Sequence, residues 1–192
     1  MNLPNKLTLL RIFLVPLMVI VYLALPNDLL VISKASGFAL KHLLALIIFS
    51  IASITDLLDG KIARKYNMIT SFGKFADPIA DKLLVNTLMI LLVYTHEINV
   101  IAVLLMIGRD LIVDALRMMA SSKGKVVSAG IYGKAKTVLQ MFALIFVLLK
   151  NWPFSIIHLP IGSILVWAAT AMSLYSGFIY FMKLKKYVLE TM

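Results

Sequence analysis

The chain has 192 residues, of which 61% are hydrophobic and only 15% are charged, and its mean hydropathy is +0.97. Soluble domains are only about half apolar, so this composition excludes an ordinary soluble protein and predicts a polytopic membrane protein. The absence of cysteine excludes disulfides and thiolate metal sites. The net charge of +10 is expected from basic residues beside membrane spans, so we predict no nucleic-acid partner.

Apolar runs of about 20 residues predict an all-α bundle of six transmembrane helices. The runs lie near residues 7–25, 39–58, 79–95, 100–119, 136–149 and 161–182. Polar or proline-containing turns separate several of them, such as Pro26-Asn27 after the first run and Asn151-Trp152-Pro153 before the last. The sequence shows no internal repeat or linker, so we expect a single membrane domain over residues 1–192.

Basic residues are distributed unequally between the two ends of the predicted helices. Of the 19 lysines and arginines, only Lys34, Lys41 and Lys150 fall on one side. Because basic loops stay in the cytoplasm, we expect both termini, the connection between the second and third helices and that between the fourth and fifth to be cytoplasmic. The protein is therefore predicted to lie in the cell (cytoplasmic, or inner) membrane.

Four aspartates gather near this cytoplasmic edge, at Asp56, Asp59, Asp77 and Asp81. A carboxylate at membrane depth costs roughly 2.5–3.5 kcal/mol, so a group of them needs a compensating partner. Residues three or four apart project from one helix face, and an antiparallel hairpin of the second and third helices would bring the two pairs together. Carboxylate oxygens suit hard cations, and two cations about 3.5–4 Å apart are suited to phosphoryl chemistry.

Two glycines and an arginine stand among these aspartates. Gly60 and Gly73 allow a ligand to approach the backbone closely, and the planar fork of Arg64 fits a phosphate. The full pattern is Asp-x-x-Asp-Gly-x-x-Ala-Arg, eight further residues, and then Gly-x-x-x-Asp-x-x-x-Asp, and it spans residues 56–81. So long a pattern indicates a functional site rather than scattered interfacial charges.

The pattern resembles the defining motif of the CDP-alcohol phosphatidyltransferase family. The six-helix arrangement extends the resemblance over nearly the whole chain. Residues 4–11, 108–110 and 133–137 are similar to family members whose acceptor is sn-glycerol 3-phosphate. The resemblance implies a membrane enzyme of phospholipid biosynthesis, a homodimer, that transfers the phosphatidyl group of CDP-diacylglycerol to this acceptor and releases CMP.

The same resemblance implies roles for individual residues. Two divalent cations, Mg²⁺ or Mn²⁺, would be bound by the aspartates Asp56, Asp59, Asp77 and Asp81. Asp81 would also be the catalytic base. Nucleotide binding would involve Asp56, Asp59, Gly60, Ala63, Arg64 and Gly73. These roles are expectations that the family pattern supplies.

The acceptor phosphate needs a separate cationic site. Basic residues of the fourth and fifth helices suit it, and with one hydroxyl they form the set Arg109, Arg117, Lys134, Lys136 and Thr137. Topology or the anchoring of anionic lipid headgroups also explains such residues. We expect Asp110 and Asp114, on the same helix, to orient the two arginines.

Two alternatives stay open at this point. The same chemistry would serve another alcohol acceptor, such as inositol phosphate, serine or a second phosphatidylglycerol. A divalent-cation transporter also places carboxylates in the membrane, but it predicts acids along a path across the bilayer. Here the acids gather at one edge, which favours the transferase.

Overall fold

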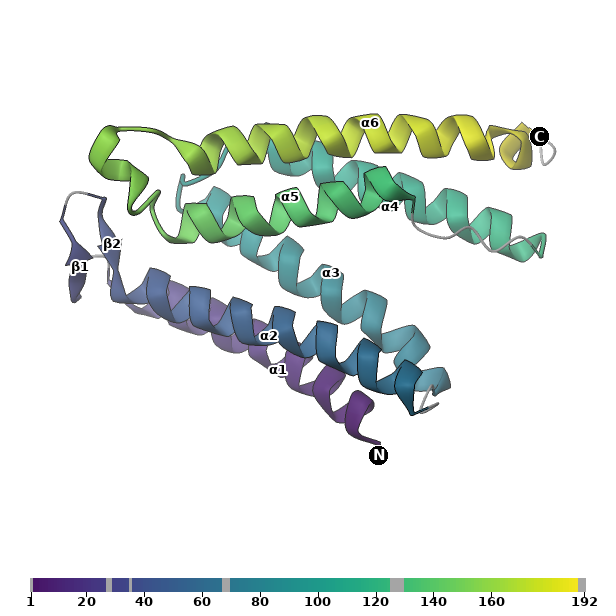
Figure 1. Ribbon diagram of the computed structural model, residues 1–192, viewed down its shortest axis with the longest axis horizontal. Coiled ribbons are helices and arrows are strands. Elements are labelled where there is room, and N and C mark those ends of the chain that lie inside the picture. The colour runs from purple at the N-terminus through teal and green to yellow at the C-terminus, as the bar shows by residue number, and fades with distance from the viewer. Residues whose placement is uncertain (1, 27–28, 35, 67–69, 125–129, 190–192) are drawn as a thin grey trace. The chain divides into compact units, whose positions relative to one another are not determined.

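The computed structural model describes residues 2–26, 29–34, 36–66, 70–124 and 130–189. Helices dominate this part of the chain, and the only described strands form one short antiparallel pair (Figure 1). The α-helices are α1 (Leu3–Ala24), α2 (Leu40–Lys65), α3 (Ser71–Tyr94), α4 (Val100–Ser122), α5 (Ile131–Leu148) and α6 (Ile161–Leu189). The remaining elements are β1 (Val31–Ser33), β2 (Phe38–Ala39) and the 3-10 helix η1 (Phe154–Ile157).

Four of the described helices, α1, α2, α5 and α6, are long and apolar enough to cross a membrane. The other two carry several charges, among them Asp77, Asp81 and Lys82 on α3 and Arg109 and Asp110 on α4. The prediction of an all-α polytopic membrane protein is therefore confirmed. That α3 and α4 also cross the membrane stays a prediction.

The helices beside the aspartates are longer than the apolar runs predicted. The second run ended at residue 58, whereas α2 continues to Lys65, and the third run began at residue 79, whereas α3 begins at Ser71. Hydropathy marks only the apolar part of a helix, and backbone hydrogen bonding continues into the charged turns beyond it. All four aspartates of the motif consequently lie inside helices.

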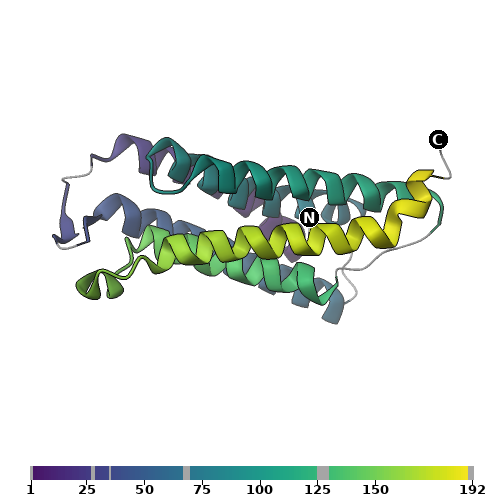
Figure 2. The same cartoon turned by 90° about the horizontal axis from the view of Figure 1, so that it is seen from above.

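The chain divides into two compact units. The first contains Met1–Tyr94 and Leu148–Leu159, and in it α1 packs against α2 and α3. The second contains Thr95–Val147 and Pro160–Met192; α4 packs against α6, and α5 runs alongside α6 (Figure 2). The single domain predicted over residues 1–192 stays a prediction.

Helix α1 begins with a cap and turns one face toward the interior of the first unit. The Asn2 side chain accepts a hydrogen bond from the Asn5 amide at the helix start, which satisfies a backbone donor that no helical carbonyl reaches. The buried residues recur every three or four positions, as one helix face requires; they are Pro4, Asn5, Thr8, Arg11, Val15, Met18 and Tyr22. This face is polar in its first half and apolar in its second.

Candidate active site

One arginine of α1 binds two aspartates of α2. The Arg11 side chain is fully buried; its Nη1 lies 2.6 Å from Asp56 Oδ1, and its Nη2 donates to Asp59 Oδ2 at 2.5 Å. The two aspartates are three residues apart, so they lie one turn apart on the same helix face. The planar guanidinium reaches both carboxylates, with a hydrogen bond to Asp59 and an ion-pair contact with Asp56. Removing one partner of the buried pair Arg11–Asp59 would leave an uncompensated buried charge, at a cost of about 3–5 kcal/mol, so the two residues are retained or lost together.

A threonine one turn earlier connects α1 to α3. Thr8 Oγ1 donates to Asp77 Oδ1 at 2.6 Å and also lies 3.1 Å from the Pro4 carbonyl oxygen. Thr8 and Arg11 share one face of α1, so this face contacts aspartates from both α2 and α3. Thr8 and Arg11 thus link Asp77 of α3 and the two aspartates of α2 to one face of α1.

Gly73 allows the close approach of α1 to the start of α3. Thr70 Oγ1 donates to Asn5 Oδ1 at 2.9 Å and accepts a hydrogen bond from the Gly73 amide at 3.0 Å. A Cβ atom at Gly73 would lie only 3.2 Å from Asn5 Oδ1 and 3.3 Å from Thr70 Oγ1. The glycine of the motif therefore has a packing role here, in addition to its predicted place in the nucleotide pocket.

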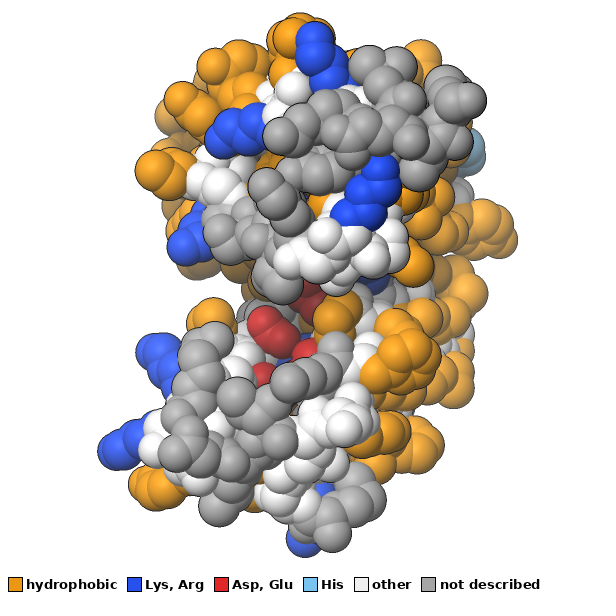
Figure 3. All heavy atoms as spheres, turned by 90° about the vertical axis from the view of Figure 1, so that its right-hand side faces the viewer, with side chains coloured by type: hydrophobic (Ala, Val, Ile, Leu, Met, Phe, Trp, Pro, Cys, Tyr) orange, Lys and Arg blue, Asp and Glu red, His pale blue; other side chains and the backbone are white. Residues whose placement is uncertain are grey.

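The other residues of the motif lie in the adjoining turns. Gly60 and Ala63 are half-buried in the last turns of α2, and Asp81 is half-buried one turn after Asp77 on α3. Arg64 belongs to α2, but its side chain lies outside the described part of the structure. Acidic and basic side chains are both visible on the face drawn in Figure 3.

The predicted metal ligands match a hard cation in their donor chemistry, because every donor is a carboxylate oxygen. Asp59 is buried, whereas the side chain of Asp56 is 38% exposed, so the cluster is open at Asp56. Within the described residues, no three histidine, aspartate or glutamate side chains converge as a metal site would require. The structure instead places the Arg11 cation against the two carboxylates of α2.

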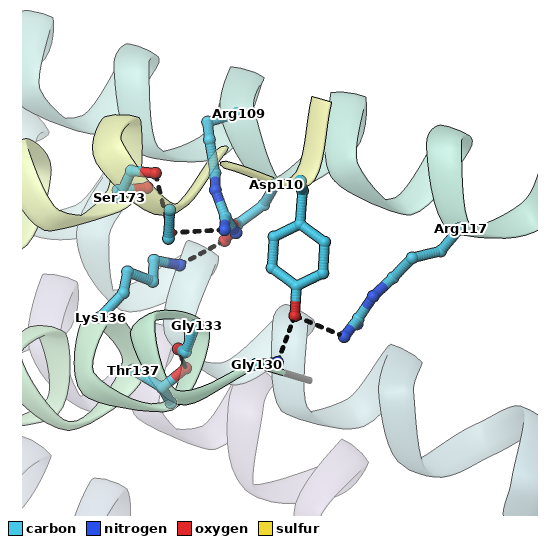
Figure 4. A network of polar contacts seen from close by, with 10 residues as sticks. Arg109, Asp110, Arg117, Gly130, Gly133, Lys136, Thr137 and Ser173 are labelled. Carbon is cyan, nitrogen blue, oxygen red and sulfur yellow. Dashed lines mark hydrogen bonds and ion pairs between the residues drawn. The ribbon is translucent and has the colours of Figure 1, made fainter. Parts of the chain in front are cut away.

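A second polar cluster lies in the other unit, around an aspartate of α4 (Figure 4). Asp110 accepts from Arg109 Nη1 at 2.9 Å through Oδ1 and from Lys136 Nζ of α5 at 2.6 Å through Oδ2. Arg109 Nη2 also donates to Ser176 Oγ of α6 at 2.7 Å. The expectation that Asp110 orients Arg109 is confirmed, and Asp110 holds Lys136 as well.

Gly177 of α6 makes room for this arrangement. A Cβ atom at Gly177 would lie 2.8 Å from Arg109 Cγ and 3.2 Å from Arg109 Nε. Only a residue without a side chain lets the arginine stem pass so close to the α6 backbone. Gly177 therefore fixes the path of Arg109 toward Ser176.

Tyr180 joins the second predicted arginine to the same cluster. Its hydroxyl accepts from Arg117 Nη2 at 3.2 Å and from the Gly130 amide at 2.5 Å. The guanidinium carbons of Arg109 and Arg117 lie 5.8 and 5.1 Å from its ring centroid, within the range of cation–π attraction. An open pocket of about 300 Å³ adjoins Tyr180 and is lined partly by Gly130.

Three of the five residues predicted to bind the acceptor phosphate are therefore brought together: Arg109, Arg117 and Lys136. Lys134 and Thr137 are exposed on α5, where the Thr137 hydroxyl donates to the Gly133 carbonyl of its own helix at 3.2 Å (Figure 4). The three clustered cations come from two helices and are tied to α6 through Ser176 and Tyr180.

Sequence reasoning assigned no role to several residues that organise these clusters. In the first unit they are Asn5, Thr8, Arg11 and Thr70, and in the second Ser176, Gly177 and Tyr180. The α1 residues left a signal, because they are polar residues at a spacing of three that leads into an apolar helix. Tyr180 left none that distinguishes it from the other aromatic residues of the apolar helices.

Comparison with known proteins places these clusters in context. The model of the CDP-alcohol phosphatidyltransferase family matches residues 1–175. A relative from Bacillus subtilis (strain 168), named CDP-diacylglycerol-glycerol-3-phosphate 3-phosphatidyltransferase, is 42% identical over 184 residues, which cover 95% of this chain and 94% of the relative. A relative of the same name from Rickettsia bellii is 39% identical over 187 residues, which cover 97% of each chain. Another from Salmonella choleraesuis is 37% identical over 179 residues, covering 91% of this chain and 90% of the relative.

Proposed function

The chain belongs to the CDP-alcohol phosphatidyltransferase family, and from this premise we propose that it transfers the phosphatidyl group of CDP-diacylglycerol to sn-glycerol 3-phosphate. The 1-hydroxyl oxygen of the acceptor forms a bond to the β-phosphorus, the bond from that phosphorus to CMP breaks, and phosphatidylglycerophosphate results. The observation that carries this proposal is that one face of α1 contacts three aspartates of the motif, Asp56, Asp59 and Asp77. The names of the relatives support the choice of acceptor.

The aspartate cluster serves the diphosphate end of the reaction. Asp56, Asp59, Asp77 and Asp81 hold divalent cations, Mg²⁺ or Mn²⁺, which when bound offset the negative charge of the diphosphate and of departing CMP. Asp81 accepts the proton of the acceptor hydroxyl. Its position one turn after Asp77 directs both carboxylates to one side of α3. Gly60, Ala63, Arg64 and Gly73 border the nucleotide.

The basic cluster binds the phosphate of the acceptor. Arg109, Arg117 and Lys136 supply charged donors, which form stronger hydrogen bonds to phosphate than neutral groups do. Their contacts with Asp110 and Tyr180 keep the side chains ordered before the acceptor arrives, which lowers the entropy lost on binding. Exposed Lys134 and Thr137 add a charge and a hydroxyl on α5.

The membrane arrangement follows the distribution of charge. All six helices span the cytoplasmic membrane, with both termini in the cytoplasm, and the enzyme is a homodimer. The acyl chains of CDP-diacylglycerol enter from the surrounding lipid.

CMP release by the purified protein tests the proposed reaction. The detergent-solubilised protein is given CDP-diacylglycerol and Mg²⁺ with sn-glycerol 3-phosphate, inositol phosphate or serine, beside an Asp81→Asn control. We expect release with sn-glycerol 3-phosphate that the control lacks. Release with a different acceptor alone would replace the acceptor, and no release combined with Mn²⁺ uptake into proteoliposomes would replace the transferase with a transporter.

A further inference from the structure

The polar half of the α1 face contacts both halves of the aspartate motif. Three residues form it, and their exposed fractions are 8% for Asn5, 1% for Thr8 and 0% for Arg11. Asn5 accepts from Thr70 at the start of α3, Thr8 donates to Asp77, and Arg11 binds Asp56 and Asp59. One helix face thus sets the position of three of the four carboxylates.

Arg11 is a costly choice if its role is stability alone. Its guanidinium is fully buried, and the face continues with apolar Val15 and Met18. Burying an ion pair carries a desolvation cost that often exceeds the attraction, and apolar replacements of similar volume are frequently neutral or stabilising. A reason other than stability is therefore needed for a charge at this position.

The geometry of the contacts supplies that reason. Arg11 does not grip one carboxylate with both nitrogens; Nη1 contacts Asp56 and Nη2 contacts Asp59. Only Nη2 makes a hydrogen bond, to Asp59, whereas the contact of Nη1 with Asp56 is an ion pair. A rigid planar group in contact with both carboxylates limits the distance between them. It contacts one oxygen of each, Oδ1 of Asp56 and Oδ2 of Asp59, so the second oxygen of each lies outside the contact with Arg11.

We propose that Arg11 is a positioning residue, which holds Asp56 and Asp59 in the orientation that binds a divalent cation. The inference rests on the proposed function, because it concerns the same carboxylates. Arg11 acts through the two aspartates and contacts no reacting atom. Thr8 does the same for Asp77 through a single hydrogen bond.

A role as a mere counter-charge and a role in positioning predict opposite results. Like charges repel, so if Arg11 only added positive charge, its removal would strengthen the binding of a divalent cation. If Arg11 positions the carboxylates, its removal leaves them disordered and weakens that binding. The sign of the change in cation affinity therefore separates the two roles.

The experiment measures Mn²⁺ binding to the purified full-length protein, without substrates, by electron paramagnetic resonance. Arg11→Met removes the charge and both contacts, and Lys6→Met is the matched control, since Lys6 is an exposed cation on the same helix. We expect Arg11→Met to raise the Mn²⁺ dissociation constant about tenfold or more and Lys6→Met to change it less than twofold. Excess Mn²⁺ should restore part of the CMP release of Arg11→Met without changing KM for sn-glycerol 3-phosphate.

Unchanged or tighter Mn²⁺ binding by folded Arg11→Met would overturn the proposal. Circular dichroism and thermal unfolding in detergent report whether the variant is folded. If the variant is not folded, Arg11→Lys decides. A single ammonium cannot contact both carboxylates through two separate nitrogens, so we expect several-fold weaker binding. Parental affinity would count against positioning. If the unsubstituted protein binds no Mn²⁺, the aspartates have no metal role in the proposed function, and the positioning role of Arg11 is also excluded.

Discussion

The two polar clusters, one in each unit, are built alike with opposite charge. In the first unit a buried arginine of α1 binds two aspartates of α2. In the second unit an aspartate of α4 binds the cations Arg109 and Lys136. Each cluster thus pairs the side chains that would meet a ligand with one central residue of the other sign, which reduces the cost of placing several like charges together.

The clusters differ in which partner is more exposed. Arg11 is 0% exposed while its partner Asp56 is 38% exposed, so the functional carboxylate faces outward over a hidden counter-ion. In the second unit the side chain of Asp110 is 20% exposed, more than Arg109 at 11% or Lys136 at 6%. The acidic cluster therefore presents Asp56 directly while Asp59 stays buried, whereas an incoming phosphate has to compete with Asp110 for the cations.

Replacing the predicted base, Asp81, should have the largest effect on activity, and it tests the role of the acidic cluster. Asp81→Asn keeps the size of the side chain but accepts no proton at neutral pH. General base catalysis is worth about 10²–10⁴ in rate, so we expect kcat for CMP release to fall by that factor, with KM for sn-glycerol 3-phosphate nearly unchanged. A kcat within threefold of the parent would exclude Asp81 as the base.

Replacing one basic side chain, Lys136, tests the role of the basic cluster. A charge-assisted hydrogen bond contributes about 1.5–3 kcal/mol, so Lys136→Met should lower kcat/KM for sn-glycerol 3-phosphate by about 10–150-fold, mainly through KM. Lys123→Met removes an exposed charge at the end of α4 and is the control, with kcat/KM expected within twofold. If Lys136 only supports the fold, Tm will fall while KM stays constant.

Adding a side chain at Gly177 should displace Arg109 without removing its charge, and so tests whether the position of Arg109 matters. The Cβ of Gly177→Ala would meet Arg109 Cγ, and overpacking costs about 1–3 kcal/mol, so we expect a lower Tm and a several-fold higher KM for the acceptor. Gly108→Ala is the matched control, since a Cβ there meets nothing within 4 Å. Equal Tm values for the two variants would show that α6 does not constrain Arg109.

Removal of one hydroxyl should have the smallest effect. Tyr180→Phe retains the ring beside Arg109 and Arg117 but loses the hydrogen bonds from Arg117 and from the Gly130 amide. The hydrogen bond from the Gly130 amide is neutral and contributes about 0.5–1.5 kcal/mol. The bond from the charged Arg117 guanidinium is long, at 3.2 Å. We therefore expect a small decrease in thermal stability and a rise of a few-fold in KM for sn-glycerol 3-phosphate. Unchanged values of both would show that the hydroxyl organises nothing.

The sequence predicted the helices and the aspartate pairs because both depend on local patterns. Apolar runs mark helices, and spacings of three and four put Asp56 with Asp59 and Asp77 with Asp81 on shared faces. The run limits were wrong beside the aspartates, where α2 extends to Lys65 and α3 begins at Ser71, because helices continue where hydropathy falls.

The organising residues were beyond such patterns. Arg11 and Asp59 are 48 positions apart, and Gly130 and Tyr180 are 50 apart, so their contacts depend on how helices pack. Arg11 also reads as a topology-setting charge at the edge of an apolar run, and only its complete burial against Asp59 shows a different role. Asp110 was predictable, since it directly follows the arginine that it orients.

The preference for sn-glycerol 3-phosphate over glycerol tests most directly the claim that each cluster has its own role. The two acceptors share the attacking hydroxyl, and only one carries the phosphate that the basic cluster would bind. The ratio of their kcat/KM values, measured as CMP release, should fall at least tenfold in Lys136→Met and stay at the parental value in Arg11→Met. An unchanged ratio in Lys136→Met would contradict the assignment of the basic cluster to the acceptor phosphate.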